Sequence, residues 1–290
     1  MPELPEVETT LRALSPHLVG QVLQRVDFRA PKLRLPMPVA ADVQGRRVEA
    51  LERRAKYMLA TLNDGQTLLM HLGMSGRFSI FYQNDTSDTV TPISRLAPTP
   101  LATHDHAVLA TDTVEMRYND PRRFGMFVLM PTATRLNHPL LADLGPEPLS
   151  PDFDGNALHA ALRGRRTALK PVLMDARVVV GVGNIYAAEA LFAAGIHPET
   201  PAEALGPTLC ARLADAIRAT LTRAIATGGS TLRDYRQPNG EAGHFQDTFA
   251  VYGHAGKPCR VCATPIAQMT QAQRSTFFCP HCQPHTQGAR

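Results

Sequence analysis

The sequence predicts a multidomain α+β chain with an N-terminal helix, a β domain, a linker, a helical domain and a small cysteine-rich C-terminal part. Three observations support this prediction. Runs typical of β-strands, separated by turn residues, fill most of residues 1–130. Apolar residues at helical spacing, followed by glycines, dominate residues 154–250. Two Cys-x-x-Cys pairs occupy residues 251–290, and the proline-rich residues 131–153 form the linker between the first two domains.

The composition is that of a globular protein. The chain has 290 residues, of which 44% are hydrophobic, so one large or two medium domains with a sizeable core are expected. No apolar run is long enough to span a bilayer, and acids stand at the N-terminus where a signal peptide would carry basic and then apolar residues. We therefore expect a soluble, cytoplasmic protein with no membrane partner.

The net charge of +4 is distributed unevenly along the chain. From Arg163 to the C-terminus there are 14 Lys/Arg against 8 Asp/Glu. The earlier part is slightly acidic but contains the compact basic stretch RRAKY, with Arg53, Arg54 and Lys56. A basic C-terminal half suits a polyanionic partner such as a nucleic acid. On charge alone, a solvated surface explains the pattern equally well.

The first ten residues, MPELPEVETT, allow two interpretations. Pro2 and Pro5 fit a helix start, where a missing N–H costs little, and the three glutamates favour the positive end of a helix dipole. Alternatively, Met1 is removed, as expected before a small second residue, and the secondary amine of Pro2 acts as a reagent. These ten residues alone do not decide between the two.

After a helix ending at about Leu14, strand patterns are expected from residue 18 onwards. The segments YMLATL and TLLMHLG flank NDGQ, which predicts a β-hairpin because Asp-Gly tolerates a tight turn. The polar, proline-rich residues 83–103 predict a surface loop. Strand patterns then resume with HAVLATD, TVEMRYND and MFVLM.

Two helical patterns stand out in the second half. In PTLCARLADAIRATLTRAIATGG a double glycine ends a run of apolar residues four apart, namely Leu209, Leu213, Ile217, Leu221 and Ile225. In VGVGNIYAAEALFAAGIHP a glycine-rich turn precedes an Ala-rich helix that stops at Gly195. The backbone N–H groups and helix dipole at such a turn favour an anion, although a glycine-rich turn alone is a weak signal.

The strongest chemical signal is a cysteine quartet with the spacing C-x2-C-x16-C-x2-C, formed by Cys259, Cys262, Cys279 and Cys282. Two tight knuckles can each offer two thiolates to one tetrahedral Zn²⁺, so we expect one structural zinc ion that stabilises this small fold. Nothing indicates an oxidising compartment that would favour disulfides, and a redox dithiol needs one Cys-x-x-Cys, not a matched pair. Four thiolates complete the site, so His254 and His281 are expected to be bystanders. The fifth cysteine, Cys210, is expected to pack within its helix.

Taken together, the motifs closely resemble those of the bacterial formamidopyrimidine-DNA glycosylases, DNA-repair enzymes that excise oxidised purines. The matching stretches run in the same order from the first residue nearly to the last: MPELPEVET, RRAKY, HLGMSGR, HDH, DPRRFG, LGPEPL, LKPVLMDARVVVGVGNIYAAEALFAAGIHP, VYGHAGKPCRVC and QRSTFFCPHC. The resemblance implies an N-terminal β-sandwich, a helix–two-turn–helix DNA-binding domain and a β-ribbon zinc finger. It also implies base excision repair of damaged double-stranded DNA by a monomeric, bifunctional glycosylase and AP lyase.

The resemblance selects the second interpretation of the N-terminus. It implies that the amine of Pro2 attacks C1′ of the damaged nucleotide and forms a Schiff base, after which β,δ-elimination cuts the strand. Glu3 is implied as the acid that protonates the sugar or base, with Glu6 supporting the site. Lys56 is implied to contact phosphate and assist β-elimination. Arg274, on the zinc finger, is implied to grip phosphate and assist δ-elimination.

The resemblance further implies that the nucleotide is flipped out of the duplex and that three side chains fill the gap. Met74, Arg122 and Phe124 match these three. The adjacent glycines favour exposed turns over core positions for Met74 and Phe124; they are Gly73, Gly76 and Gly125. Further DNA contacts are implied for His71, His104, Arg165, Lys170 and Asn184.

The base preference stays open. Residues 236–245, RQPNGEAGHF, correspond to the loop that caps the flipped base, but His244 stands where an aromatic such as tyrosine is common. The nearest alternative is an endonuclease VIII-like glycosylase for oxidised pyrimidines, whose intercalating residues differ from those found here. A catalytically silent DNA-binding protein would require loss of Pro2 or Glu3 or retention of Met1. An RNA-binding zinc-ribbon protein leaves MPELPEVET unexplained.

Overall fold

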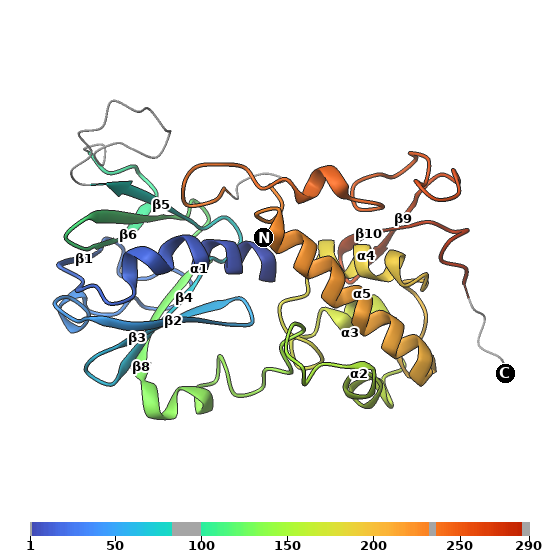
Figure 1. Cartoon of the computed structure of the whole chain (residues 1–290), viewed down its shortest axis with the longest axis horizontal. Coiled ribbons are helices and arrows are strands. Elements are labelled where there is room, and N and C mark those ends of the chain that lie inside the picture. Colours follow the sequence, from blue (N-terminus) through green and yellow to red (C-terminus); the bar gives the residue numbers. More distant parts are fainter. Residues whose placement is uncertain (1, 83–99, 232–235, 286–290) are drawn as a thin grey trace. The chain divides into compact units, whose positions relative to one another are not determined.

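The computed structural model describes residues 2–82, 100–231 and 236–285. The chain divides into two compact units (Figure 1): the first unit comprises residues 1–142 and 227–244, and the second unit comprises residues 143–226 and 245–290. Most of the loop expected at residues 83–103 lies outside the described residues. A membrane-spanning helix is absent from the described part of the chain, where no helix combines the necessary length and apolar character.

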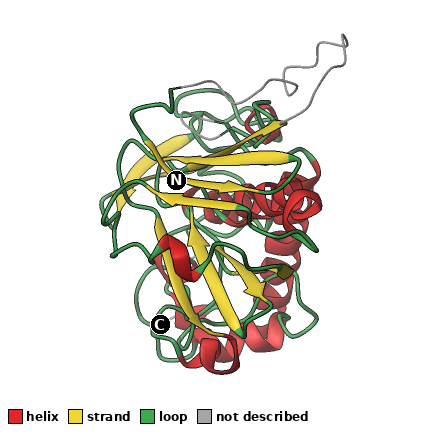
Figure 2. Cartoon of the chain, turned by 90° about the vertical axis from the view of Figure 1, so that its left-hand side faces the viewer, coloured by secondary structure: helices red, strands yellow, loops and turns green. Residues whose placement is uncertain are grey.

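The first unit is a β-sandwich of two four-stranded antiparallel sheets, whose strands are seen in Figure 2. One sheet has the strand order β1-β6-β7-β5 and the other the order β2-β3-β4-β8. The strands are β1 (Arg25–Phe28), β2 (Val48–Arg54), β3 (Tyr57–Leu62), β4 (Gln66–His71), β5 (Arg77–Tyr82), β6 (Asp105–Ala110), β7 (Val114–Asn119) and β8 (Met126–Pro131). The Asp-Gly hairpin is confirmed, because β3 and β4 pair antiparallel with Thr61 opposite Thr67. Short 3-10 helices follow β1 and β8, at Ala40–Asp42 and Thr132–Asn137.

Helix α1 (Leu4–Leu18) extends one turn beyond the expected end at Leu14. Pro16 lies in this last turn, where it removes one helical hydrogen bond and its ring crowds the preceding turn, at a cost of about 3 kcal/mol. Leu18 is only 1% exposed and packs with Leu14 in the core of the sandwich. Burying a leucine contributes about 1.5–3 kcal/mol, so the packing of Leu18 offsets most of the cost of continuing the helix past the proline.

The second unit is helical and ends in a two-stranded ribbon. Its helices are α2 (Gly155–Leu162), α3 (Leu169–Leu173), α4 (Asn184–Ala193) and α5 (Pro207–Ala226), and its strands are β9 (Ala267–Gln271) and β10 (Arg274–Phe278). Two 3-10 turns complete it, at Ala202–Ala204 and Phe245–Thr248. The glycine-rich turn and the glycine stop that the sequence predicts do bracket α4, with Gly183 as its N-cap and Gly195 just beyond its end at φ +63°.

The apolar ridge of α5 is buried at its centre and emerges at its ends. Leu213, Ile217 and Leu221 are fully buried, whereas Leu209 and Ile225 are half-buried. A step of four residues overshoots one helical turn by about 40°, so a strict four-residue ridge winds around the helix. Other small residues, including Cys210, complete the buried face, which confirms the packing role expected for this cysteine.

Candidate functional site

The N-terminal residues are fixed by a buried carboxylate. Pro2 is buried directly before Glu3, the N-cap of α1, and Glu3 forms a capping box with Glu6. The amide N–H of Glu3 donates to Oε2 of Glu6 at 2.8 Å. Oε1 of Glu6 accepts the amide N–H of Ser230 at 2.8 Å and its hydroxyl at 3.0 Å. One carboxylate therefore ties the residue that follows Pro2 to the segment 227–244 of the same unit.

Two consecutive glycines allow the segment 227–244 to approach the carboxylate of Glu6 closely. Gly228 and Gly229 have φ of +76° and +77°, a conformation that L side chains rarely adopt. A Cβ at Gly229 would lie 2.9 Å from Oε1 of Glu6, so no larger residue fits without displacing the carboxylate. The double glycine that the sequence marks as the end of a helix thus also shapes the site.

Lys56 and His71 lie near each other at the ends of neighbouring strands. Lys56 is half-buried in the two-residue turn between β2 and β3, beside Ala55 at φ 55°. Burial, followed by the nearby charges of Lys56 and Arg34, lowers the pKa of His71 to about 4. The imidazole is therefore neutral at pH 7. Because its Nδ1 accepts the N–H of Gly73 at 3.0 Å, its proton is on Nε2, where it can be donated to a phosphate oxygen.

The three side chains matched to the duplex wedge come together in the structure. Met74 and Phe124 are 36% and 41% exposed, as expected for turns rather than for core positions. The guanidinium of Arg122 lies over the Phe124 ring at 5.2 Å from its centroid. Gly73, at φ +68°, has no room for a Cβ because the backbone of Phe124 fills the space. The backbones of the two turns that carry Met74 and Phe124 are therefore packed against each other.

Asp120 organises both of these turns, and sequence analysis did not single it out. It is fully buried; its Oδ1 accepts the Ser75 hydroxyl at 2.6 Å, and its Oδ2 accepts the Gly125 N–H at 2.8 Å and the Tyr118 hydroxyl at 3.2 Å. Its position at the start of DPRRFG, where aspartate often bonds to its own turn, was the available signal. The sequence suggested that Gly76 and Gly125 mark exposed turns, but neither has a positive φ. Glycine is needed at both positions because a Cβ there would clash with Tyr118.

His104 is exposed beside this cluster. Its carbonyl accepts the N–H of Asp120 at 3.0 Å, and the carbonyl of Asp120 lies 3.1 Å from Nε2 of the buried His106. The HDH motif thus anchors the Asp120 turn through its backbone and its second histidine. Only His104 keeps a side chain that is open to solvent.

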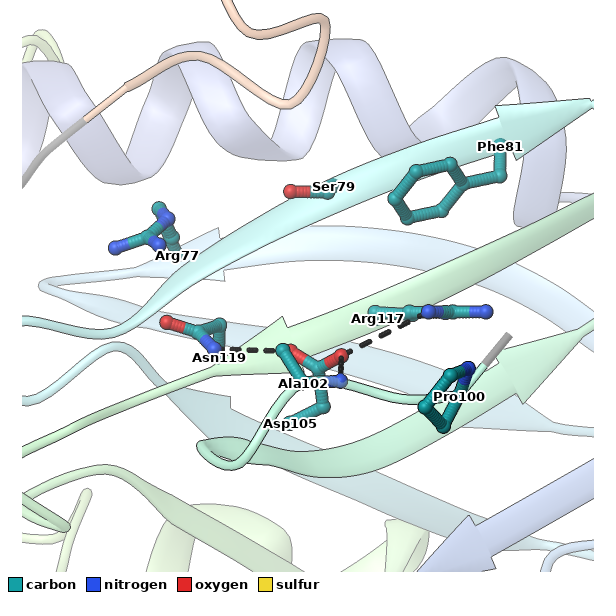
Figure 3. Close-up of a pocket in the computed structure, with 8 residues that line it drawn as sticks. All are labelled: Arg77, Ser79, Phe81, Pro100, Ala102, Asp105, Arg117 and Asn119. Atoms are coloured by element: carbon teal, nitrogen blue, oxygen red, sulfur yellow. Dashed lines mark hydrogen bonds and ion pairs between the residues drawn. The ribbon is translucent and has the colours of Figure 1, made fainter. Parts of the chain in front are cut away.

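A separate pocket of about 230 Å³ lies over strands β5 and β7 (Figure 3). Arg117 and Asn119 on its wall both bind Asp105, at 3.8 Å and 2.9 Å, and Arg117 also binds Glu115 at 2.5 Å. The positive charge of Arg117 in the pocket wall is therefore paired with the carboxylates of Asp105 and Glu115. None of the residues that the sequence selects for chemistry lines this pocket.

In the second unit, Lys170 is buried and joins α4 to the zinc-finger ribbon. Its side chain is 1% exposed, and its Nζ lies 2.5 Å from Oδ1 of Asn184 and 2.9 Å from Oγ1 of Thr276. The amide of Asn184 donates to the carbonyl of Ser275 at 3.1 Å, and the Thr276 hydroxyl donates to Gln271 at 2.9 Å. The ammonium of Lys170 thus binds protein atoms on both α4 and β10, and a direct contact with DNA stays a prediction.

Arg274 stands at the start of β10, immediately after a strained turn. The pair Gln271 and Arg274 closes a two-residue turn, and both central residues, Ala272 and Gln273, have positive φ. This is the dihedral pattern of a type I′ turn, which usually contains Asn or Gly, so the two L side chains here store strain. Arg274 is exposed and lines a pocket of about 100 Å³ together with Lys170.

Arg165 lies apart from this group. Its Nη1 is 3.3 Å from Asp175, a carboxylate shared with Arg177. Hydrogen bonds from Arg177 lower the pKa of Asp175 to about 2, so the carboxylate is charged at neutral pH. The guanidinium of Arg165 therefore already has an anionic partner.

The four predicted ligands form a zinc site. The Sγ atom of Cys262 is 3.4 Å from that of Cys279 and 3.5 Å from that of Cys282, and the Cys259 and Cys282 sulfurs are 3.9 Å apart. A tetrahedral zinc with Zn–S bonds of about 2.3 Å requires sulfur separations of about 3.8 Å. Burial raises the pKa of Cys279 and Cys282, a penalty on thiolates that a divalent cation offsets. The donor set and geometry fit one structural Zn²⁺.

Glu189 of α4 is a second residue that sequence analysis missed. Its buried carboxylate accepts the amide N–H groups of Ala250, Val251 and Tyr252 at 2.8–3.0 Å. These residues lead into the finger, whose apolar core also includes Ala188 of α4. The finger and α4 therefore form one packed body.

Family models match almost the whole chain. Residues 1–127 match the formamidopyrimidine-DNA glycosylase N-terminal domain, residues 144–236 the H2TH domain of the same enzymes, and residues 256–284 the zinc finger found in FPG and IleRS. Among curated relatives, the formamidopyrimidine-DNA glycosylase of Thiobacillus denitrificans is 51% identical over 286 residues, covering 98% of this chain and 100% of that protein. The enzyme of the same name from Paraburkholderia phymatum is 47% identical over 289 residues, with the same coverage.

Solved structures are similar over the same length. The MutM (Fpg) protein of Thermus thermophilus superimposes with a TM-score of 0.84 at 42% identity, covering 97% of this chain and 98% of that one. The Lactococcus lactis Fpg in complex with DNA containing an abasic site gives a TM-score of 0.85 at 32% identity, covering 97% and 99%. A variant of that protein bound to Fapy-dG DNA gives the same score and identity, covering 98% and 100%.

Proposed function

Since the chain belongs to the formamidopyrimidine-DNA glycosylase family, we propose that it excises oxidised purines from double-stranded DNA through a covalent bond to the amine of Pro2. It is a DNA-repair glycosylase and AP lyase with one structural zinc. The observation that carries the Pro2 assignment is the hydrogen-bonded chain Glu3–Glu6–Ser230, which holds the residue next to the nucleophile in one position. Pro2 must be the first residue of the mature protein for this chemistry, so we also propose that Met1 is removed.

Base excision and strand cleavage follow from one attack. The unprotonated amine of Pro2 bonds to C1′, and the N-glycosidic bond breaks, so the base leaves with the bonding electrons and takes up a proton. Protonation by Glu3 opens the sugar ring and yields the Schiff base. Loss of the C2′ proton then breaks the C–O bond to the 3′ phosphate, and a second elimination breaks the bond to the 5′ phosphate. Lys56 and Arg274 serve these two steps by binding the phosphates.

Three exposed side chains of the first unit open the duplex. Met74, Arg122 and Phe124 enter the space left by the flipped nucleotide, at a cost of a few kcal/mol in lost stacking. His71 binds a phosphate with its neutral Nε2–H donor. Asn184 binds a phosphate at the start of α4, where the positive end of the helix dipole attracts the anion. His104 and Arg165 are assigned further contacts with the DNA backbone.

The remaining proposals concern the domain boundaries, the cellular location and the oligomeric state of the protein. We divide the chain into a catalytic β-sandwich at 1–130, a linker at 131–153, a DNA-binding domain at 154–250 and a zinc finger at 251–290. Within the third part, residues 227–244 pack with the first unit and serve the catalytic domain. The protein acts in the cytoplasm, where bacterial DNA lies, and acts as a monomer because one chain supplies every residue named above.

The decisive experiment is borohydride trapping on a duplex with one 8-oxoguanine opposite cytosine, followed by mass mapping of the cross-linked peptide. The expected product is an adduct on the amine of Pro2, in protein whose intact mass shows that Met1 is absent. Pro5→Gly is the matched control and should still be trapped, whereas Pro2→Gly should lose most of the adduct. Absence of any adduct from protein lacking Met1 would overturn the purine-repair function; trapping only on oxidised thymine would point to the pyrimidine enzyme.

A further inference from the structure

A second cluster of metal-ligating side chains lies in the same unit as the zinc site. His197, Glu199 and His285 bring one potential ligand atom each to within 4.8 Å of one another. His197 is 6% exposed, while Glu199 and His285 are exposed, so an ion can reach the cluster from solvent. None of the three belongs to the machinery assigned above.

The cluster is held in place by the fold. Gln283 is fully buried, donates to the carbonyl of Ile196 at 2.8 Å and accepts the N–H of Cys279 at 2.9 Å. These two hydrogen bonds hold the residues that follow Cys282, the last zinc ligand, against the turn that contains His197. The centroids of the two imidazole rings are 4.7 Å apart, and the Phe278 ring packs against His197 in a T-shaped arrangement with the ring centroids 4.6 Å apart. The histidines are thus positioned before any ion binds.

We propose that His197, Glu199 and His285 form a second metal site, for Zn²⁺ or another divalent first-row transition ion. Two imidazoles and a carboxylate are a ligand set that such ions favour, and three protein ligands leave a fourth position for water. Burial, together with the neighbouring His285, lowers the pKa of His197, which favours the neutral form that binds metals. The ion must displace one interaction, the 3.2 Å bond from the Glu199 amide N–H to Nδ1 of His197.

An ion at this site would stiffen the support of the DNA-contacting ribbon. Pro198, between two of the ligands, accepts the backbone N–H of Lys170 and a side-chain N–H of Gln271, both at 3.3 Å. Gln271 closes the strained turn before Arg274. Metal occupancy at the turn is therefore linked, through Pro198, to the hairpin that carries Arg274.

Metal content tests the proposal directly. The full-length protein is equilibrated with a small molar excess of Zn²⁺, desalted and analysed by plasma mass spectrometry. We expect two zinc ions per chain in the parent, one in His285→Ala, and two in His281→Ala, the matched control on the same finger. One ion in the parent, or two in His285→Ala, would overturn the proposal, as would a second ion retained only at millimolar zinc.

Cobalt substitution identifies the ligands independently of activity. The first equivalent of Co²⁺ should give the intense sulfur-to-cobalt charge-transfer band of the cysteine site. The second equivalent should add only weaker d–d bands from nitrogen and oxygen ligands, and these should be missing in His285→Ala. A second equivalent that also shows charge transfer would mean that it binds cysteine, which contradicts the assignment.

Discussion

At the scale of single residues, buried charges hold the exposed reactive groups in place. Asp120 shows this most directly, because it receives hydrogen bonds from Ser75, Tyr118 and Gly125 while being fully buried itself. Hydrogen bonds to a charged group contribute about 1.5–3 kcal/mol each. The turns that carry Met74 and Phe124 thus depend on a side chain that would not touch DNA.

Replacing Asp120 by Asn should therefore loosen both turns. One carboxylate oxygen becomes an NH₂ group that faces a donor, so we expect the free energy of unfolding to fall by about 2–4 kcal/mol. Urea denaturation measures this, and lesion binding should weaken in parallel. Asp112→Asn, at an exposed aspartate, is the control and should change stability by less than about 0.5 kcal/mol. Equal effects of the two substitutions would contradict the role given to Asp120.

His71 predicts how stability depends on pH. Its pKa of about 4 in the folded protein lies below the usual 6.5, so the unfolded chain takes up a proton first as the pH falls. Stability should therefore decrease between about pH 6.5 and pH 4 by roughly 2–3 kcal/mol from this group. Chemical denaturation at neutral pH and near pH 4.5 should show a smaller acid loss in His71→Gln than in the parent or in His104→Gln. An unchanged acid loss in His71→Gln would show that the histidine is not buried in its neutral form.

At the scale of elements, local patterns were predicted well and long-range partnerships were not. The Asp-Gly hairpin, the α5 ridge and the paired cysteines each depend on residues close in sequence, so their geometry follows from spacing. The Glu6–Ser230 bond joins residues 224 positions apart, and no local pattern encodes it. The same reason hid the contacts of Asp120 with Ser75, those of Glu189 with residues 250–252, and the burial of Lys170 against Thr276.

The contact between Lys170 and the ribbon predicts an effect on strand cleavage. Thr276→Val removes the hydroxyl that binds both Lys170 and Gln271 but keeps the side-chain volume. We expect base excision to change little and the δ-elimination product to fall by about fivefold, since the lost hydrogen bond to Lys170 is worth about 1 kcal/mol. Gel analysis of the cleavage products gives both rates. Thr270→Val, on the exposed side of β9, should leave the product ratio unchanged; a shift there as large as in Thr276→Val would refute a specific role.

At the scale of the whole molecule, the two units have separate cores and separate sources of stability. The first has the sandwich core with α1, and the second has the zinc finger packed on α4 through residues such as Ala188 and Phe277. Structural zinc typically contributes about 10–16 kcal/mol to the folding of such a finger. Loss of the ion should therefore affect one unit far more than the other.

Removing zinc with a chelator and a thiol reagent should unfold the finger and expose the amides of α4. Amides in the sandwich sheets should keep their protection, because their hydrogen bonds and core lie in the other unit. Hydrogen exchange followed by mass spectrometry resolves the two regions. Restoring zinc under reducing conditions should restore protection, and a uniform loss across both units would show that they unfold together.

The chain crosses between the units at three places, because the segment 227–244 returns to the first unit before the finger begins. That segment carries Ser230, the partner of Glu6, and its neighbouring glycines have no room for larger residues. A recombination event that exchanged the first 142 codons between two relatives would bring in Glu6 from one relative and leave Ser230 and its glycines from the other. Functional chimaeras should therefore require two crossover points around codons 227–244, so the first unit is inherited as a discontinuous module.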